Sequence, residues 1–345
     1  MPDSDVTVRQ KDEVLEQKIR ELIQYVGSDP TTFDSDLVSQ IIMTSLKLSR
    51  DNSDTGQLKL MTRALKEMRY AYSIFNSYPN RQRISIFGSA RTPEEHRDYQ
   101  AAKSFSSLIS EQGWVCITGA ADGIMKAGLE GAQRESSFGL SIRLPFETPA
   151  NSLLAGDPKL ITFRYFFTRK LMFLSHSDAI AAFPGGVGTQ DELFEVLTLM
   201  QTGKANILPV VLLEGEAGRY WESWEHYLRS SLLDNGWISL EDLNLFYRAP
   251  SVEAAVEHIT KFYFRYHSSR YVQDTLVIRL KSPLSDEQIL LLNEEYQALL
   301  KSGYIYATTP LPVETDHLSL PRIAFEHNHK HFGLLRSLID RVNAF

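Results

Sequence analysis

The chain has 345 residues, of which 43% are hydrophobic and 23% charged, a composition ordinary for a globular protein that buries a sizeable core. Its formal net charge of −7 argues against nucleic acid or an anionic membrane as the main partner. A single cysteine, Cys116, excludes an intramolecular disulfide and an all-cysteine metal site. Because the sequence shows neither an apolar leader nor a stretch of membrane-spanning length, we expect a cytoplasmic protein.

Residues 1–80 are expected to form an N-terminal helical extension. Apolar residues recur at helical spacing in three stripes, over residues 15–26, 37–48 and 58–75. Turn-forming residues at 27–30 and 52–56 separate the stripes. These apolar faces would pack against the rest of the chain or against a second subunit.

From residue 83 onward, strand-like and helix-like stretches alternate, which is typical of a parallel sheet covered by helices. The expected strands are 84–87, 115–118, 139–143, 160–163, 179–183 and 207–213, and the expected helices are 94–112, 123–134, 165–176, 189–202 and 220–232. The pattern predicts an α/β fold with a Rossmann-like, doubly wound parallel sheet over residues 81–266. Right-handed crossovers then place the loops after residues 87, 118 and 183 on one edge of the sheet, where such sheets bind ligands.

Residues 267–345 are expected to form a small C-terminal α+β extension. Strands are expected at 276–280, 304–308 and 322–325, and helices at 285–301, with Ser285 as its cap, and at 332–342. Three histidines at alternate positions, His327, His329 and His331, are either metal ligands or a solvated or pH-sensitive edge. Only Glu326 offers a further ligand at suitable spacing.

A glycine-rich turn separates the expected strand at 179–183 from a helix that begins near Gly188 or Thr189. The turn contains three glycines and a threonine: Gly185, Gly186, Gly188 and Thr189. Such a turn presents unpaired backbone N–H groups and the positive end of a helix dipole, so phosphate is its natural ligand. Asp191 and Glu192 follow in the first helical turn, where they either complement the helix dipole alone or act on the ligand.

Residues 184–192 read PGGVGTQDE and match the PGGxGTxxE motif of the LOG ("lonely guy") family of nucleoside 5′-monophosphate phosphoribohydrolases. The second motif of that family is an Arg-Lys pair, and here Arg169 and Lys170 stand 23 and 22 residues before Glu192. Over roughly residues 58–265 the chain therefore resembles the long, bacterial-type members of the LOG family.

The resemblance implies hydrolysis of the N-glycosidic bond of a nucleoside 5′-monophosphate, AMP-like or a cytokinin riboside monophosphate, to free base and ribose 5-phosphate. It makes Arg169 and Glu192 the catalytic residues and implies no metal or redox cofactor. Substrate and phosphate contacts would come from Gly185, Gly186, Gly188, Thr189, Ser89, Arg91, Lys170, Gly119 and Asn151. LOG family members are at least dimers, so a homodimer or higher homo-oligomer is expected, with the site close to the subunit interface.

Three features leave alternatives open. Ala120, Ala121 and Asp122 stand where similar family members carry a glycine-rich run, which would suit a catalytically weak nucleotide-binding or sensing protein on the same scaffold. Arg91 either contacts the nucleotide or pairs with a nearby glutamate, at 94 or 95. The aromatic run at 163–167 either stacks on a base or packs in the core.

Two other activities fit the sequence poorly. The loop after the first strand lacks the G-x-G-x-x-G run of a dinucleotide site. Relatives of this kind have also been labelled lysine decarboxylases, but that chemistry needs a pyridoxal phosphate Schiff-base lysine, and no pyridoxal-type motif surrounds Lys170.

Overall fold

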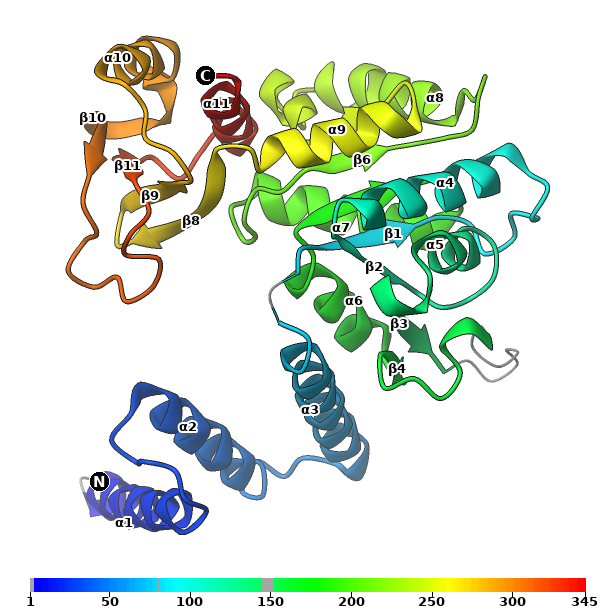
Figure 1. The fold of residues 1–345 in the computed structure, drawn as a ribbon. Helices are drawn as coiled ribbons and strands as arrows, with labels where there is room; N and C mark the ends of the chain where they lie inside the picture. Colours follow the sequence, from blue (N-terminus) through cyan, green and yellow to red (C-terminus); the bar gives the residue numbers. More distant parts are fainter. Residues whose placement is uncertain (1–2, 80, 144–151) are drawn as a thin grey trace. The chain divides into compact units, whose positions relative to one another are not determined.

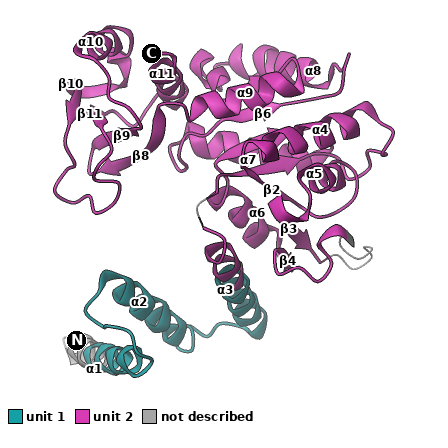
Figure 2. Cartoon of the chain, viewed as in Figure 1, with its two compact units in different colours: residues 1–69 teal, residues 70–345 magenta. Residues whose placement is uncertain are grey.

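The computed structural model describes residues 3–79, 81–143 and 152–345, and its contacts divide the chain into two compact units, residues 1–69 and 70–345 (Figure 2). The first unit contains α1 (Asp3–Tyr25), α2 (Phe33–Lys47) and most of α3 (Thr55–Asn76). The three predicted apolar stripes lie on these three helices. The expected boundaries after residues 80 and 266 stay predictions.

Within the described residues, the second unit contains a seven-stranded parallel sheet with the order β4-β3-β2-β1-β5-β6-β7. The strands are β1 (Arg83–Phe87), β2 (Val115–Thr118), β3 (Ser137–Ile142), β4 (Leu160–Phe163), β5 (Ala179–Ala182), β6 (Val210–Leu212) and β7 (Tyr247–Arg248). The chain builds outward from β1 to β4, then returns to lie beside β1 as β5. The predicted Rossmann-like, doubly wound α/β fold is confirmed, and the reversal point lies between β1 and β5.

Helices cover both faces of this sheet (Figure 1). One face carries α4 (Arg97–Glu111), α5 (Ile124–Ala132) and α9 (Val252–Phe262), and the other carries α6 (Phe166–Ser175) and α7 (Val187–Gln201). Successive side chains of a strand point to opposite faces of the sheet, so neighbouring residues of β1 pack against different layers of helices. Ile84 and Ile86 join the core beneath α4, α5 and α9, whereas the ring of Phe87 lies 5.1 Å from that of Phe173 on α6.

The C-terminal residues form a second, antiparallel sheet with the order β10-β11-β9-β8. Its strands are β8 (Tyr266–Val272), β9 (Thr275–Leu280), β10 (Leu300–Thr308) and β11 (Arg322–His327), with helices α10 (Asp286–Glu295) and α11 (Phe332–Ala344). Buried Arg336 joins α11 to the parallel-sheet domain, since its guanidinium lies 2.9 Å from Nε2 of His258 and 4.6 Å from the ring centre of Phe262. Residues 267–345 thus belong to the same compact unit as the parallel sheet.

The structure corrects several expected elements. The helix expected at 285–301 ends at Glu295, although Ser285 caps it as predicted, and Lys301 lies in β10 because pairing with β11 begins at Leu300. Strands β7 and β8 and helix α9 were not predicted. No helix in the described ranges is long and apolar enough to cross a lipid bilayer.

Candidate functional site

The glycine-rich turn lies at the reversal point of the sheet. Strand β5 ends at Ala182, and α7 begins at Val187 with Gly186 as its N-cap, slightly earlier than the sequence predicts. The N–H of Ser89, in the loop after β1, donates to the carbonyl oxygen of Pro184 at 3.1 Å. The loops that follow β1 and β5 are therefore tied together at the carboxyl edge, where open α/β sheets bind ligands.

The glycines of this turn have different structural roles. A β-carbon on Gly185 would lie 2.1 Å from Oγ1 of Thr189 and 2.9 Å from the backbone nitrogen of Ser89, so packing requires glycine there. A β-carbon on Gly186 or Gly188 would meet nothing within 4 Å, and neither residue has a positive φ. Packing and backbone strain therefore do not demand glycine at these two positions. The open space exposes the first N–H groups of α7, which lack intrahelical acceptors.

Glu192 is buried in the first turns of α7, with a relative exposure of 7%. Among the residues that the structure describes, its Oε2 atom has no hydrogen-bond partner. Burial raises the pKa of Glu192 from 4.5 to about 7, against the opposing effect of the Lys170 and Arg169 cations. A buried carboxylate oxygen without a partner is costly, and such groups with perturbed pKa values are concentrated at functional sites.

Arg169 approaches the site from the first turns of α6. Its guanidinium carbon lies 5.0 Å from the ring centre of Phe166 and 5.8 Å from that of Phe173. A β-carbon on Gly119, in the loop after β2, would lie 3.7 Å from Nη1 of Arg169. Arg169 thus reaches across the sheet edge toward a second loop, and its charge acts on Glu192.

Lys170 has a different environment. Its Nζ atom lies 2.6 Å from Oδ2 of Asp191 and 3.2 Å from Oε2 of Glu195, both on α7. The side chain is only 12% exposed, whereas those of Asp191 and Glu195 are 62% and 41% exposed. These ion pairs join α6 to α7 next to Glu192.

The loop after β2 has a backbone conformation that glycine favours, although it contains alanines. Ala120 has a φ of +54°, in the left-handed region, and its methyl group packs in a small apolar cluster with Leu129 and Leu154. Gly123 has a φ of +63°, and a β-carbon there would lie 2.2 Å from the carbonyl oxygen of Ser89. The methyl of Ala120 therefore points into the interior, and the loop is fitted closely to the loop after β1.

Ser89 and Arg91, two further predicted contacts, lie in the loop after β1. The Oγ atom of Ser89 accepts a hydrogen bond of 3.1 Å from the N–H of Arg91. Arg91 is exposed and forms no ion pair with the described residues, while Glu94 pairs with Lys126. Asn151 lies outside the described residues. Gly119, Ser89 and the glycine turn are thus brought to one edge together with Arg169, Lys170, Thr189 and Glu192.

Only part of the aromatic run at 163–167 packs in the core, and stacking on a base stays a prediction for the rest. Phe163 is fully buried, whereas Phe166 and Phe167 are 55% and 52% exposed. Tyr165 stacks on Phe167 with ring centres 5.5 Å apart. Part of the run is therefore core, and part is an exposed apolar surface beside Arg169.

A hydrogen-bond relay behind the glycine turn was not predicted. The hydroxyl of Tyr220, the first residue of α8 (Tyr220–Tyr227), donates to the carbonyl oxygen of Gly185 at 2.6 Å. Gln190 donates from Nε2 to the Tyr220 hydroxyl at 2.6 Å and accepts from Nε1 of Trp224 at 2.8 Å. Gln190 lies inside the PGGxGTxxE motif, but no local pattern links it to aromatic residues about thirty positions later.

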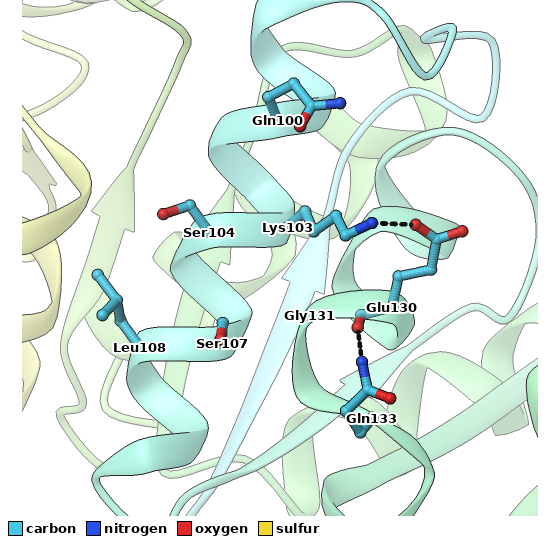
Figure 3. Close-up of a pocket in the computed structure, with 8 residues that line it drawn as sticks. All are labelled: Gln100, Lys103, Ser104, Ser107, Leu108, Glu130, Gly131 and Gln133. Carbon is cyan, nitrogen blue, oxygen red and sulfur yellow. Dashed lines mark hydrogen bonds and ion pairs between the residues drawn. The ribbon is translucent and has the colours of Figure 1, made fainter.

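Two other features lie apart from this site. A shallow groove between α4 and α5 (Figure 3) is lined by Gln100, Lys103, Ser104, Ser107, Leu108, Glu130, Gly131 and Gln133. Lys103 pairs with Glu130 across it at 2.9 Å, and Gln133 bonds to the Glu130 carbonyl. These polar groups satisfy one another, and the groove contains neither motif, so it is not the candidate site.

The three C-terminal histidines form no metal site in the described part of the chain, where no group of three or more His, Cys, Asp or Glu side chains is placed to hold an ion. The interpretation as a solvated edge is wrong for His327, which is fully buried. Burial lowers its pKa to about 4, and its Nδ1 lies 2.6 Å from the Tyr271 hydroxyl. His329 is half exposed, as expected of an edge. β11 turns His327 into the core because strand residues alternate between faces.

Comparisons with known proteins agree with the two motifs. Residues 118–259 match the family model described as "Possible lysine decarboxylase". Two curated relatives from Arabidopsis thaliana are cytokinin riboside 5′-monophosphate phosphoribohydrolases: LOG1 is 35% identical and LOG4 33% identical over 94 residues. Each alignment covers 27% of this chain and 42% of the relative, so the chain spans about two fifths of the length of these relatives.

Among solved structures, the molybdenum cofactor binding protein from Rippkaea orientalis is 23% identical, with 52% of this chain and 96% of that chain covered. Its TM-score of 0.37 is too low to support an inference. Both motifs lie inside the matched residues 118–259, and this part of the chain is similar to the LOG family.

Proposed function

We propose that this protein hydrolyses the N-glycosidic bond of nucleoside 5′-monophosphates, releasing the free base and ribose 5-phosphate. The observation that carries the proposal is Glu192, a buried carboxylate without a hydrogen-bond partner for Oε2 among the described residues, beside an open glycine turn. The curated relatives are named for this reaction on cytokinin riboside monophosphates. The chain's own preference among bases, AMP-like or cytokinin-like, belongs to the proposal.

The turn after β5 would hold the 5′-phosphate. The exposed N–H groups at the start of α7 and the hydroxyl of Thr189 are hydrogen-bond donors, and the helix dipole favours an anion at this end. The turn lacks the lysine of a Walker-type loop, so it suits a single terminal phosphate. Ser89 and Gly119, in the neighbouring loops, would contact the same nucleotide.

In the proposed reaction, charged side chains stabilise the transition state, and no cofactor is required. As the C1′–N bond breaks, its electron pair leaves with the base, which takes up a proton, and C1′ becomes cationic. A water oxygen then bonds to C1′ and loses a proton. The Glu192 carboxylate would stabilise the cation and orient or deprotonate that water, while Arg169 would balance negative charge on the phosphate or the departing base.

The direct test is to incubate the purified protein with a panel of nucleosides and nucleoside mono- and triphosphates and to follow free base by chromatography. We expect release from monophosphates and little from adenosine or ATP. Comparable turnover of adenosine and AMP would overturn the proposed role of the glycine turn. Binding of AMP without any release of adenine would favour a nucleotide-binding or sensing protein, the interpretation that Ala120 and its neighbours suggest from sequence.

We also propose that the protein works as a homodimer or a higher homo-oligomer. Phe166, Phe167 and Leu171 on α6 are each more than 40% exposed, and they form an apolar surface next to Arg169. A second copy covering this surface would also shield the site from water. Sedimentation analysis should give at least twice the mass of one chain, and a monomer at micromolar concentration would contradict the proposal.

A further inference from the structure

We propose that Tyr220 is a positioning residue, whose hydroxyl fixes the peptide group between Gly185 and Gly186 and so aims the Gly186 N–H at the bound phosphate. The proposal rests on the proposed function for the identity of the ligand. Tyr220 lies on a different element from the turn, because it begins α8, which follows β6.

Tyr220 is firmly held at the start of its helix. The Glu214 carboxylate accepts a hydrogen bond from the backbone N–H of Tyr220 at 2.8 Å and another from the N–H of Trp221 at 3.3 Å. Trp221 is fully buried, and its Nε1 donates to the carbonyl oxygen of Leu213 at 2.8 Å. These hydrogen bonds hold the backbone at the start of α8, so the position from which the Tyr220 side chain extends is fixed.

The direction of each hydrogen bond in the relay follows from the chemistry of its members. The indole N–H of Trp224 can only donate, so it selects Oε1 of Gln190 and leaves Nε2 facing Tyr220. Because Nε2 can only donate, the Tyr220 oxygen must accept from it. The single hydroxyl hydrogen of Tyr220 is then left for the carbonyl oxygen of Gly185.

Holding a peptide carbonyl in one orientation also sets the orientation of the N–H in the same peptide group. The chain has no cis peptide bond in its described part, and in a planar trans peptide the C=O and the following N–H point in opposite directions. The bond from Tyr220 holds the Gly185 carbonyl toward α8, so the Gly186 N–H points away from α8. A β-carbon on Gly186 would meet nothing within 4 Å, so the chain leaves that residue open.

Without the hydroxyl, this peptide group would have considerable freedom. Two consecutive glycines lack the side chains that restrict rotation of the peptide group between them. A ligand would then have to bind a turn that samples several orientations, and its affinity would fall by the fraction of time spent in the wrong ones. Glu192 depends less on this peptide group, because it lies within α7 and the helix holds its backbone.

The test compares Tyr220→Phe with the matched control Tyr263→Phe. Tyr263 also donates its hydroxyl to a backbone carbonyl at 2.6 Å, that of Asp178, but this carbonyl precedes β5 at the opposite edge of the sheet. Each variant loses one hydroxyl of the same kind. Calorimetric titration with inorganic phosphate and steady-state kinetics with AMP are measured on the full chain for both variants and the wild type.

We expect Tyr220→Phe to bind inorganic phosphate about fivefold to tenfold more weakly, as one lost neutral hydrogen bond allows. The KM for AMP should rise by a similar factor, with kcat changed by less than about threefold, because Glu192 is untouched. Tyr263→Phe should match the wild type in both measurements, even where its melting temperature falls equally.

Wild-type phosphate affinity in Tyr220→Phe, the same loss in both variants, or a wild type that does not bind phosphate would overturn the role of Tyr220. Failure of the proposed function gives a different result. Phosphate binding that weakens only in Tyr220→Phe, in a protein that releases no base from AMP, would leave the positioning role intact and refute the hydrolysis.

Discussion

Replacing Glu192 with glutamine should stabilise the protein at neutral and alkaline pH while removing its activity. Burial raises the pKa of this carboxyl from 4.5 to about 7. Since a tenfold change in an ionisation equilibrium corresponds to about 1.4 kcal/mol, ionised Glu192 costs about 3 kcal/mol of folding free energy. Glutamine keeps the shape of the side chain and has no charge to desolvate.

The direction in which the free energy of unfolding changes with pH follows from the same rise in the pKa of Glu192. Between pH 4.5 and about 7, the folded wild type keeps this proton while the unfolded chain has lost it, so the free energy of unfolding falls as pH rises. Relative to Glu192→Gln, the wild type should lose roughly 2.5 kcal/mol between pH 5 and pH 8. Below pH 4.5 the two proteins should differ only by the packing and hydrogen bonding of the amide.

Urea unfolding at pH 5 and pH 8, followed by tryptophan fluorescence, measures this difference. Glu195→Gln is the matched control, because Glu195 is on the same helix and its side chain is 41% exposed in an ion pair with Lys170. The control should change the free energy of unfolding by less than about 1 kcal/mol at either pH. A Glu192→Gln protein that is equally destabilised at both pH values would refute the account of Glu192 as a desolvated carboxylate.

Three further predictions concern the same site. Because the proposed mechanism uses the ionised form of Glu192, log kcat/KM for AMP should rise with pH up to about 7 and then level. A profile flat from pH 5 to 8 would contradict this. Gly186→Ala should weaken AMP binding about tenfold with an unchanged melting temperature. Gly185→Ala should instead lower the melting temperature, because its β-carbon would meet Thr189. Calorimetry measures both the affinity and the melting temperature, and the reverse pattern would contradict the two roles. Arg169→Lys should lose at least about tenfold in kcat/KM despite keeping the charge, since it lacks the planar fork, and near-normal kinetics would remove Arg169 from the site.

Most of the parallel-sheet domain could be predicted from sequence because its pattern is local. Short apolar runs and amphipathic stretches alternate there, and the crossover rule brings the loop of Ser89 and the turn of Gly185 to one edge. The order of the strands and the position of the reversal between β1 and β5 became visible only in the structure. The misplaced end of α10 has a tertiary cause, since pairing with β11 draws Leu300 into a strand.

The candidate site could be located from its motifs, but the ion pairs, burial and pKa values of its residues could not be predicted. The two motifs point to Arg169 and Glu192, yet neither motif says that Lys170 carries the ion pairs to α7. The burial of Glu192 depends on what packs around α7, so its raised pKa has no sequence signal. The support from Tyr220 joins elements far apart in the chain, and only the fold places its hydroxyl on the Gly185 carbonyl.

The central claim is that this site breaks an N-glycosidic bond by means of Glu192, and one paired measurement tests it most directly. Wild type and Glu192→Gln are each incubated with AMP, with adenine and ribose 5-phosphate quantified over time and AMP affinity measured by calorimetry. The account predicts equal amounts of both products from the wild type over many turnovers. It also predicts that Glu192→Gln retains AMP binding within a few fold and loses on the order of a hundredfold or more in rate. Equal rates of adenine release from the two proteins, or none from either while both bind AMP, would contradict it.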